Sequence, residues 1–186
     1  EVTLKILKVA ALALFALVAL FLVIGLFLPS SAHVERSTII ARPAVQVFTV
    51  LDSYKLFSSW SPWAARDPQA KVTFEGPDSG AGAKQSWAGN EAVGSGSQTI
   101  LESRPNEFVR TQVDFGGRGS AAASFKLQPA EGGTRVTWGF DAPFGWNITS
   151  RWFGLMFESF IGPDYEQGLA NLKALVEKFP DADWTG

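Results

Sequence analysis

The sequence contains no cysteine and a single histidine, His33. Without cysteine the chain has no disulfide framework, no thiol nucleophile and no cysteine-bound zinc or iron–sulfur cluster. One histidine excludes any site that needs two imidazoles, and no group of residues has metal-ligand spacing. We therefore predict that the protein uses no metal and no cofactor.

A strong charge of either sign is also lacking. Lys and Arg total 16 against 18 Asp and Glu, which gives a formal net charge of −2. Proteins that bind nucleic acid carry clustered Lys and Arg, and no basic block occurs in this sequence. Nucleic acid is therefore excluded as a predicted partner.

One long apolar run is present, from Val9 to Leu28. At a rise of about 1.5 Å per residue, a helix of this length matches the hydrocarbon core of a bilayer, about 30 Å thick. Lys5 and Lys8 precede the run, and the positive-inside rule places such residues in the cytoplasm. We predict a cytoplasmic flank over residues 1–8 and a transmembrane signal-anchor over 9–28. The remaining domain, 29–186, would then lie on the periplasmic or extracellular side of the cell membrane.

Two alternatives for this run stay open. A buried core helix has the same composition, and Ser30, Ser31 and Ala32 resemble the small-residue cleavage site of a signal peptide. The apolar run is longer than the roughly 7–15 residues of a signal-peptide core. This length favours an uncleaved anchor.

The rest of the chain predicts a sheet followed by a helix. A strand at 33–41 precedes a helix that Arg42 and Pro43 open, and a short helix or turn follows near 54–60. Period-two alternation with turn signals between the segments predicts antiparallel strands at 71–75, 83–89, 95–103, 107–115, 120–128 and 134–141. One face of these strands is apolar and aromatic, as expected of a sheet that is covered on one side.

The last third has helical periodicity. Ser150 or Asn147 caps a predicted helix through Phe160, which Gly162 and Pro163 interrupt. Asp164 and Gln167 resemble a capping box for a second helix. The apolar stripe of that helix consists of Tyr165, Leu169, Leu172, Val176 and Phe179. This stripe is expected to pack on the apolar face of the sheet.

This order of elements, with its short motifs, resembles the SRPBCC superfamily of START-like proteins, and within it the polyketide cyclase/dehydrase-like group. The resemblance covers 33–179 and is carried by the segments His33–Ser37, Ala41–Pro43, Trp60–Trp63, Gly82–Lys84, Ser86–Asn90, Gly94–Gly96, Val136–Trp138, Gly162–Glu166 and Gly168–Leu172. It implies an α+β helix-grip fold of the START/Bet v 1 type. In that fold a curved antiparallel sheet wraps around a long C-terminal helix, here preceded by one N-terminal transmembrane helix.

The resemblance also implies a deep, mostly apolar cavity between sheet and helix. Members of the superfamily bind lipids, sterols, polyketides or plant hormones, and a few are cyclases or dehydratases. They share no set of catalytic residues, so we assign none. The aromatic residues predicted to line the cavity are Trp60, Trp63, Trp87, Phe115, Trp138, Phe140, Phe153, Phe157 and Phe160. The alternative is that these rings simply fill the core.

We therefore predict a membrane-tethered domain that binds a small hydrophobic molecule, such as a lipid, an isoprenoid or a polyketide-like compound. One alternative is a cyclase or dehydratase that uses Tyr165 or Glu158 as a single acid, whereas Asp164 is better explained as a cap. Another is an envelope protein-interaction module that docks through exposed Trp60 and Trp63. These two rings are also candidates for a rigid lip at the cavity opening.

Overall fold

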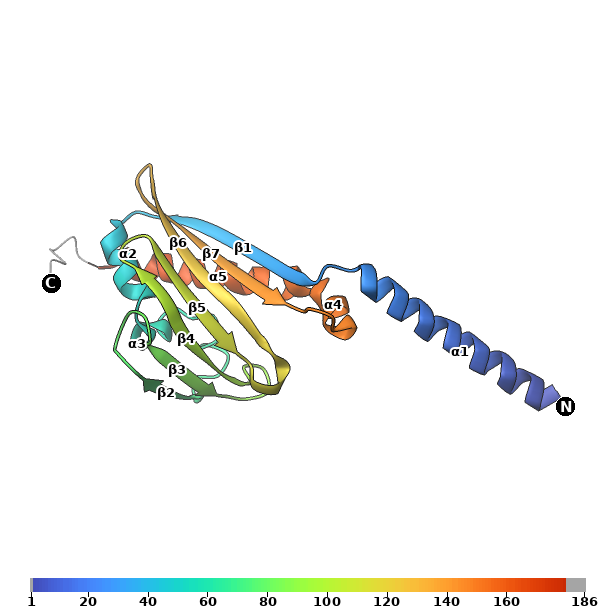
Figure 1. The fold of residues 1–186 in the computed structure, drawn as a ribbon. Coiled ribbons are helices and arrows are strands. Elements are labelled where there is room, and N and C mark those ends of the chain that lie inside the picture. Colours follow the sequence, from blue (N-terminus) through green and yellow to red (C-terminus); the bar gives the residue numbers. More distant parts are fainter. Residues whose placement is uncertain (1, 180–186) are drawn as a thin grey trace.

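The computed structural model describes residues 2–179, apart from the side-chain environment of Arg118. Residue 1 of the predicted flank and residues 180–186 of the predicted domain therefore lie outside the described residues. Figure 1 shows a long N-terminal helix that projects from a sheet wrapped around a second long helix. The elements are α1 (Val2–Phe27), β1 (Ser31–Ile40), α2 (Ala44–Leu51), α3 (Tyr54–Phe57), β2 (Lys71–Glu75), β3 (Lys84–Ala88), β4 (Ser95–Arg104), β5 (Phe108–Asp114), a 3-10 turn at Gly116–Arg118, β6 (Ser120–Ala130), β7 (Gly133–Pro143), α4 (Ile148–Gly154) and α5 (Phe157–Val176).

The strands form one seven-stranded antiparallel sheet in the order β1-β7-β6-β5-β4-β3-β2. Consecutive strands from β2 to β7 pair as hairpins, while β1 closes the other edge against β7. Each strand begins and ends within a few residues of its predicted range, because alternation and turn residues specify both its register and its limits. The predicted α+β helix-grip fold is confirmed.

The apolar face of the sheet wraps around α5. The predicted stripe on α5 is buried at Tyr165, Leu169, Leu172 and Val176, and Phe179 packs partly against the same core. From the sheet, alternate residues of β6 and β7 point inward, as in Phe125, Leu127, Val136, Trp138 and Phe140. Helices α2 and α3 cover one end of this core with Val47, Val50, Leu51 and Tyr54.

The break between α4 and α5 lies at Leu155 and Met156, so the predicted interruption at Gly162 and Pro163 is wrong. Asn147 caps α4 by accepting a hydrogen bond from the Ser150 amide at 3.0 Å, as predicted. The amides of Leu155 and Met156 then bond three residues back, at 3.3 and 2.9 Å. Such bonds tighten the last turn and end a helix. Pro163 is tolerated in the second turn of α5, where it removes one helical donor.

Gly162 is needed for the approach of β1 to α5. A Cβ at this position would collide with the guanidinium of Arg36, which reaches across from β1. Arg36 donates through Nη2 to Glu158 at 2.5 Å and through Nε to Glu166 at 2.7 Å. These carboxylates lie one helical turn before and one after Gly162, so Arg36 clamps the helix to the sheet edge.

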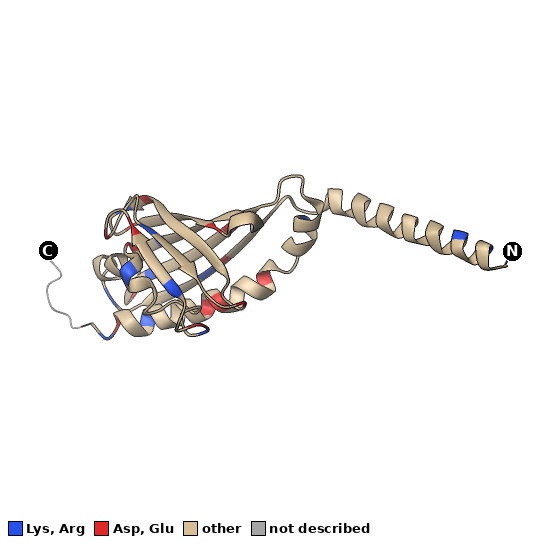
Figure 2. Cartoon of the chain, turned by 90° about the horizontal axis from the view of Figure 1, so that it is seen from below, with Lys and Arg blue, Asp and Glu red and all other residues tan. Residues whose placement is uncertain are grey.

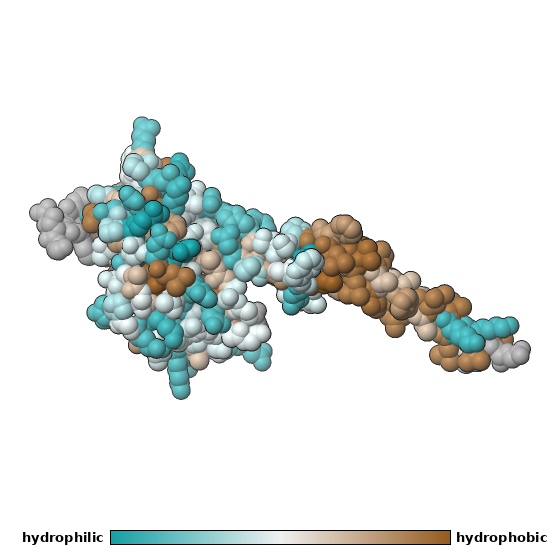
Figure 3. Space-filling model, viewed as in Figure 1, coloured by the Kyte–Doolittle hydropathy of each residue, from teal (hydrophilic) through white to brown (hydrophobic). Residues whose placement is uncertain are grey.

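Helix α1 is apolar along almost its whole length and, among the described residues, is the one helix long and apolar enough to span a membrane. Its charged side chains, Lys5 and Lys8, lie near its N-terminal end (Figure 2), and a hydrophobic surface covers the rest (Figure 3). Only Gly25 of α1 is buried, which argues against the alternative of a core helix within this chain.

The end of α1 is fixed to α4. Trp152 stacks on Phe21 with ring centroids 5.1 Å apart and donates through Nε1 to the Phe21 carbonyl at 3.2 Å. Arg151 is buried and donates through Nη1 to the Leu26 carbonyl at 2.8 Å. A positive charge at these carbonyls also complements the negative end of the helix dipole.

Candidate functional site

A cavity of about 300 Å³ lies between the inner face of the sheet, α3, the segment 58–70 and α5. The sheet contributes residues from β2 to β7, whereas α5 contributes Ile161 and Tyr165. The lining residues are Leu51, Tyr54, Phe57, Ser58, Ser61, Trp63, Ala64, Asp67, Pro68, Ala70, Val72, Gln85, Trp87, Val93, Gln98, Thr111, Val113, Phe115, Ala123, Phe125, Trp138, Phe140, Ile161 and Tyr165. Most are apolar or aromatic, as in cavities that take small organic ligands.

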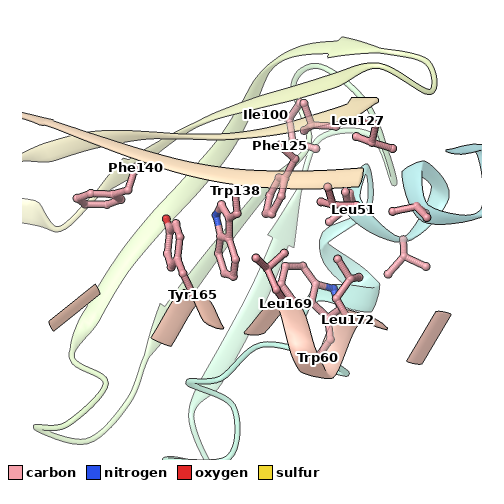
Figure 4. Close-up of a cluster of buried hydrophobic side chains, with 14 of the residues drawn as sticks. Leu51, Trp60, Ile100, Phe125, Leu127, Trp138, Phe140, Tyr165, Leu169 and Leu172 are labelled. Carbon is pink, nitrogen blue, oxygen red and sulfur yellow. The ribbon is translucent and has the colours of Figure 1, made fainter. Parts of the chain in front are cut away.

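One wall of the cavity is a row of aromatic rings in mutual contact (Figure 4). Trp138 stacks on Tyr165 with centroids 3.8 Å apart, and the Phe125 ring lies 5.0 Å from Trp138 on the other side. Phe140 meets the edge of Tyr165 at 6.3 Å. Because each ring is held by its neighbours, the wall resists collapse into the empty space.

The segment 58–70 closes over this wall and is pinned to α5. Trp63 donates through Nε1 to Asp164 Oδ2 at 3.1 Å. The guanidinium of Arg66 also bonds both carboxylate oxygens of Asp164. Asp164 therefore lies inside α5 and joins it to the segment 58–70, so its predicted role as a helix cap is wrong.

The structure brings five of the nine predicted lining residues to the cavity. These are Trp63, Trp87, Phe115, Trp138 and Phe140. Trp60 lies behind the wall instead, with its ring 5.4 Å from Trp138 and 4.9 Å from Phe57. Because Trp60 is only 2% exposed, it cannot contribute to a docking patch. The alternative of a protein-interaction module that docks through Trp60 and Trp63 is therefore wrong for Trp60.

The other three predicted residues lie toward α1. Phe157 stacks on Phe140 at 5.9 Å from outside the cavity. Phe153 and Phe160 are each 59% exposed and do not line it. The prediction treated 152–160 as one helix. The break at Leu155 changes the helical phase and turns these two rings outward.

The prediction missed several apolar lining residues, such as Phe57, Val113 and Phe125, and it also missed a set of buried polar residues. Tyr54, Gln85, Gln98 and Thr111 line the cavity and are between 4% and 9% exposed. The signal was present in the alternation, since Gln85 is two residues from Trp87 and Thr111 lies between Val109 and Val113. Residues two apart in a strand share a face. The prediction selected aromatic rings only and therefore passed over these polar residues.

Burial governs the titratable groups of this wall. Burial raises the pKa of Tyr165 and of Tyr54 well above the ordinary value of 10.0 for tyrosine. Both hydroxyls therefore stay protonated at neutral pH and can donate hydrogen bonds. Glu158, the other predicted acid, is 60% exposed in its ion pair with Arg36 and does not line the cavity.

No group of three His, Cys, Asp or Glu side chains that could hold a metal occurs among residues 2–179. Apart from the Asp67 carboxylate and the tryptophan indoles, the side-chain donors and acceptors of the cavity wall are hydroxyls and amides, which suit hydrogen bonding to an organic molecule.

Comparison with known proteins places residues 31–177 in the family model described as polyketide cyclase / dehydrase and lipid transport. No curated protein matches the sequence. Among solved structures, a Chromobacterium violaceum protein aligns with a TM-score of 0.57 and 18% identity, over 82% of this chain and 99% of its own. Ara h 8.0201 aligns with a TM-score of 0.53 and 10% identity, over 78% of this chain and 97% of its own.

The di-domain ARO/CYC StfQ from the steffimycin biosynthetic pathway also shares the fold. It aligns with a TM-score of 0.57 and 12% identity, over 80% of this chain and 51% of StfQ. This chain thus spans about half the length of that protein. At these identities, the three structures are similar to this chain in fold.

Proposed function

Because the chain belongs to the polyketide cyclase / dehydrase and lipid transport family, we propose that its cavity binds a small hydrophobic molecule. The observation that carries the proposal is the aromatic-walled space of about 300 Å³ between the sheet and α5. This is at the lower end of the range for ligand cavities, about 300–1,000 Å³. Lipid, isoprenoid and polyketide-like compounds are the classes that the family description and the lining favour.

Desolvation supplies the binding energy in this proposal. Each square ångström of apolar surface removed from water contributes roughly 25 cal/mol. The walls need little rearrangement, because Trp138 is stacked on Tyr165 and Trp63 is held by Asp164. A preformed site loses less free energy to ordering when it binds.

Filling the cavity from the sheet tests the proposal. Ala123 lines the space, whereas Ala122 is its neighbour on the outer face of β6. We expect Ala123→Phe to weaken binding of the fluorescent probe 1-aminoanthracene at least tenfold, since the new ring occupies the cavity. Ala122→Phe is the matched control and should bind as the unmodified protein does. Undiminished binding by a folded Ala123→Phe protein would contradict the proposal.

In this proposal α1 crosses the cell membrane and tethers the domain to it. Its 26 residues extend for about 39 Å at 1.5 Å per residue, which suffices for a bilayer core. Lys5 and Lys8 at its start favour a cytoplasmic N-terminus and a domain on the periplasmic or extracellular side.

A second feature supports a membrane beside α4. The large apolar side chains around the junction with α1 are exposed, and they include Trp146, Phe153, Leu155, Met156 and Phe160. Aromatic residues of this kind favour the membrane–water interface. Contact with the bilayer would remove these side chains from water, which explains why rings outside the cavity are exposed at this end.

A further inference from the structure

The wall of the cavity formed by β3, β4 and β5 carries a polar cluster that a purely apolar ligand leaves unused. Gln85 and Gln98 lie directly opposite each other on β3 and β4, which puts their Cβ atoms about 5 Å apart. Thr111 on β5 is diagonal to Gln98, because Gln98 pairs with Val113 two residues away. Tyr54 of α3 reaches the same place, with its side chain beside Thr111.

Hydrogen-bonding capacity remains free in this cluster. The Tyr54 hydroxyl is buried next to the Thr111 side chain, but it makes no hydrogen bond of standard geometry with it or with any other described residue. Neither side-chain amide of Gln85 or Gln98 bonds another residue in the described part of the chain. Thr111 makes one long bond, from its hydroxyl to the Ala123 carbonyl at 3.5 Å. Polar groups buried without partners are costly, so a ligand that offers a complementary group gains affinity here.

Charge defines what that complementary group can be. Among the described residues that line the cavity, Asp67 is the one charged side chain. Its carboxylate is already bonded by the amides of Asn90 at 2.7 Å and Gln69 at 3.1 Å. A carboxylate or phosphate on the ligand would lose its hydration and meet no cation in the wall.

We propose that the ligand is an uncharged amphiphile whose hydroxyl or carbonyl group binds the cluster of Tyr54, Gln85, Gln98 and Thr111 while its apolar body lies against the aromatic wall. This inference rests on the proposed function and narrows it. Amide and hydroxyl groups both donate and accept, so they suit an alcohol or a ketone. The class comprises neutral lipids and aromatic compounds with a hydroxyl or keto end.

The test compares dodecan-1-ol, dodecane and dodecanoate, which differ in the end group alone. Each compound is used to displace 1-aminoanthracene from the full chain in lipid nanodiscs. For each compound, the affinity of a variant is divided by the affinity of the unmodified protein. Partition into the lipid is the same for every variant, so the ratio reports the protein's own contribution. Gln98→Leu and Tyr54→Phe remove parts of the cluster, and Gln112→Leu changes the exposed face of β5 as a matched control.

We expect Gln98→Leu and Tyr54→Phe to lower the affinity for dodecan-1-ol by about tenfold. The affinity for dodecane should stay the same or rise, and both variants should still bind 1-aminoanthracene. Gln112→Leu should change none of these affinities, and the ratios for dodecanoate should stay near one, because the cluster does not hold a charged end group. Equal effects of the variants on the alcohol and the alkane, or a larger effect on dodecanoate than on the alcohol, would overturn the neutral-amphiphile assignment while leaving hydrophobic binding intact. If 1-aminoanthracene and dodecane both fail to bind the unmodified protein, the proposed function itself fails, and this inference fails with it.

Discussion

The indole Nε1 of Trp63 donates a hydrogen bond to Oδ2 of Asp164 at 3.1 Å, and this contact joins the segment 58–70 to α5. The Asp164 side chain is only 13% exposed and also pairs with Arg66. One face of the Trp63 ring lines the cavity while its polar atom is held by the helix. The covering segment and the helix therefore act as one wall.

Removing this acceptor should weaken both the fold and the site. We expect Asp164→Ala to lower the free energy of unfolding by about 1–3 kcal/mol, because the Trp63 indole and the Arg66 guanidinium lose their buried partner. Urea unfolding of the full chain in detergent micelles, followed by tryptophan fluorescence, measures this. We also expect faster dissociation of 1-aminoanthracene in stopped flow.

The control for that variant is Glu75→Ala, which removes an exposed partner of Lys84 at 3.3 Å. Exposed ion pairs contribute about 0–1 kcal/mol, so this change should be small. If both variants unfold alike, Asp164 has no special role in fixing the segment 58–70.

Gly168 lets α5 approach the aromatic wall closely. A Cβ there would lie 2.6 Å from Cζ3 of Trp138, whose ring is buried and stacked on Tyr165. We expect Gly168→Ala to destabilise the protein by about 1–3 kcal/mol through overpacking, although alanine favours a helix by about 1 kcal/mol over glycine. Thermal unfolding measured by circular dichroism tests this.

Gly117 offers a comparison without the same neighbours, because a Cβ at that position meets nothing within 4 Å. Gly117→Ala should leave the melting temperature nearly unchanged. A stabilised Gly168→Ala protein would show that the Trp138 ring can move aside.

Asp52 should make stability depend on pH. Burial raises the pKa of its carboxyl above the usual 3.8, even though Ser103 donates a hydrogen bond to it at 2.6 Å. The unfolded chain then loses this proton at a lower pH than the folded one. The contribution of Asp52 to stability falls as pH rises from 3.8 through the raised pKa.

We therefore expect Asp52→Asn to become more stable than the unmodified protein as pH increases across that window, and to show no such gain below it. Urea unfolding at a series of pH values gives the difference. Asp78→Asn alters a carboxylate that is 80% exposed and serves as the comparison. A gain that is the same at every pH would argue against burial of the charge as its cause.

The absence of cysteine allows a direct test of membrane contact near α4. A single cysteine at Phe153 or Phe160 accepts one nitroxide label, and the full chain is then reconstituted in liposomes. We expect both labels to collide readily with oxygen and poorly with a polar nickel chelate, as in the membrane interface. A label at Leu101, an exposed apolar residue of β4, should show the reverse. Similar accessibility at all three positions would contradict bilayer contact.

Much of the fold could be predicted because it depends on local patterns. Alternation specified the strands, as at Lys71–Glu75, where the predicted and observed limits coincide. The stripe from Tyr165 to Val176 specified which face of α5 is buried. The failure occurred at Pro163, which lies inside α5, where Arg36 of β1 bonds Glu158 and Glu166 on either side of it.

The site was less predictable, because it depends on how elements meet. Trp60 and Trp63 are three residues apart on the same segment, yet Trp60 fills the core while Trp63 lines the cavity. Gln85 and Gln98 lie on the inward face and line the cavity, but lining residues were chosen among aromatic rings only, so neither was predicted. Such departures from the simple pattern are expected at functional positions.

The link between α1 and the domain is very short. Three residues, 28–30, separate Phe27 from Ser31, and a stretch of that length spans at most about 10 Å. Arg151 also restrains this link, because its guanidinium donates hydrogen bonds to the carbonyls of Leu26 and Leu28. With α1 held in a bilayer as proposed, the cavity stays beside that one membrane. A bound molecule would then enter and leave at its surface, and a role as a soluble shuttle between two membranes is incompatible with the proposed tether.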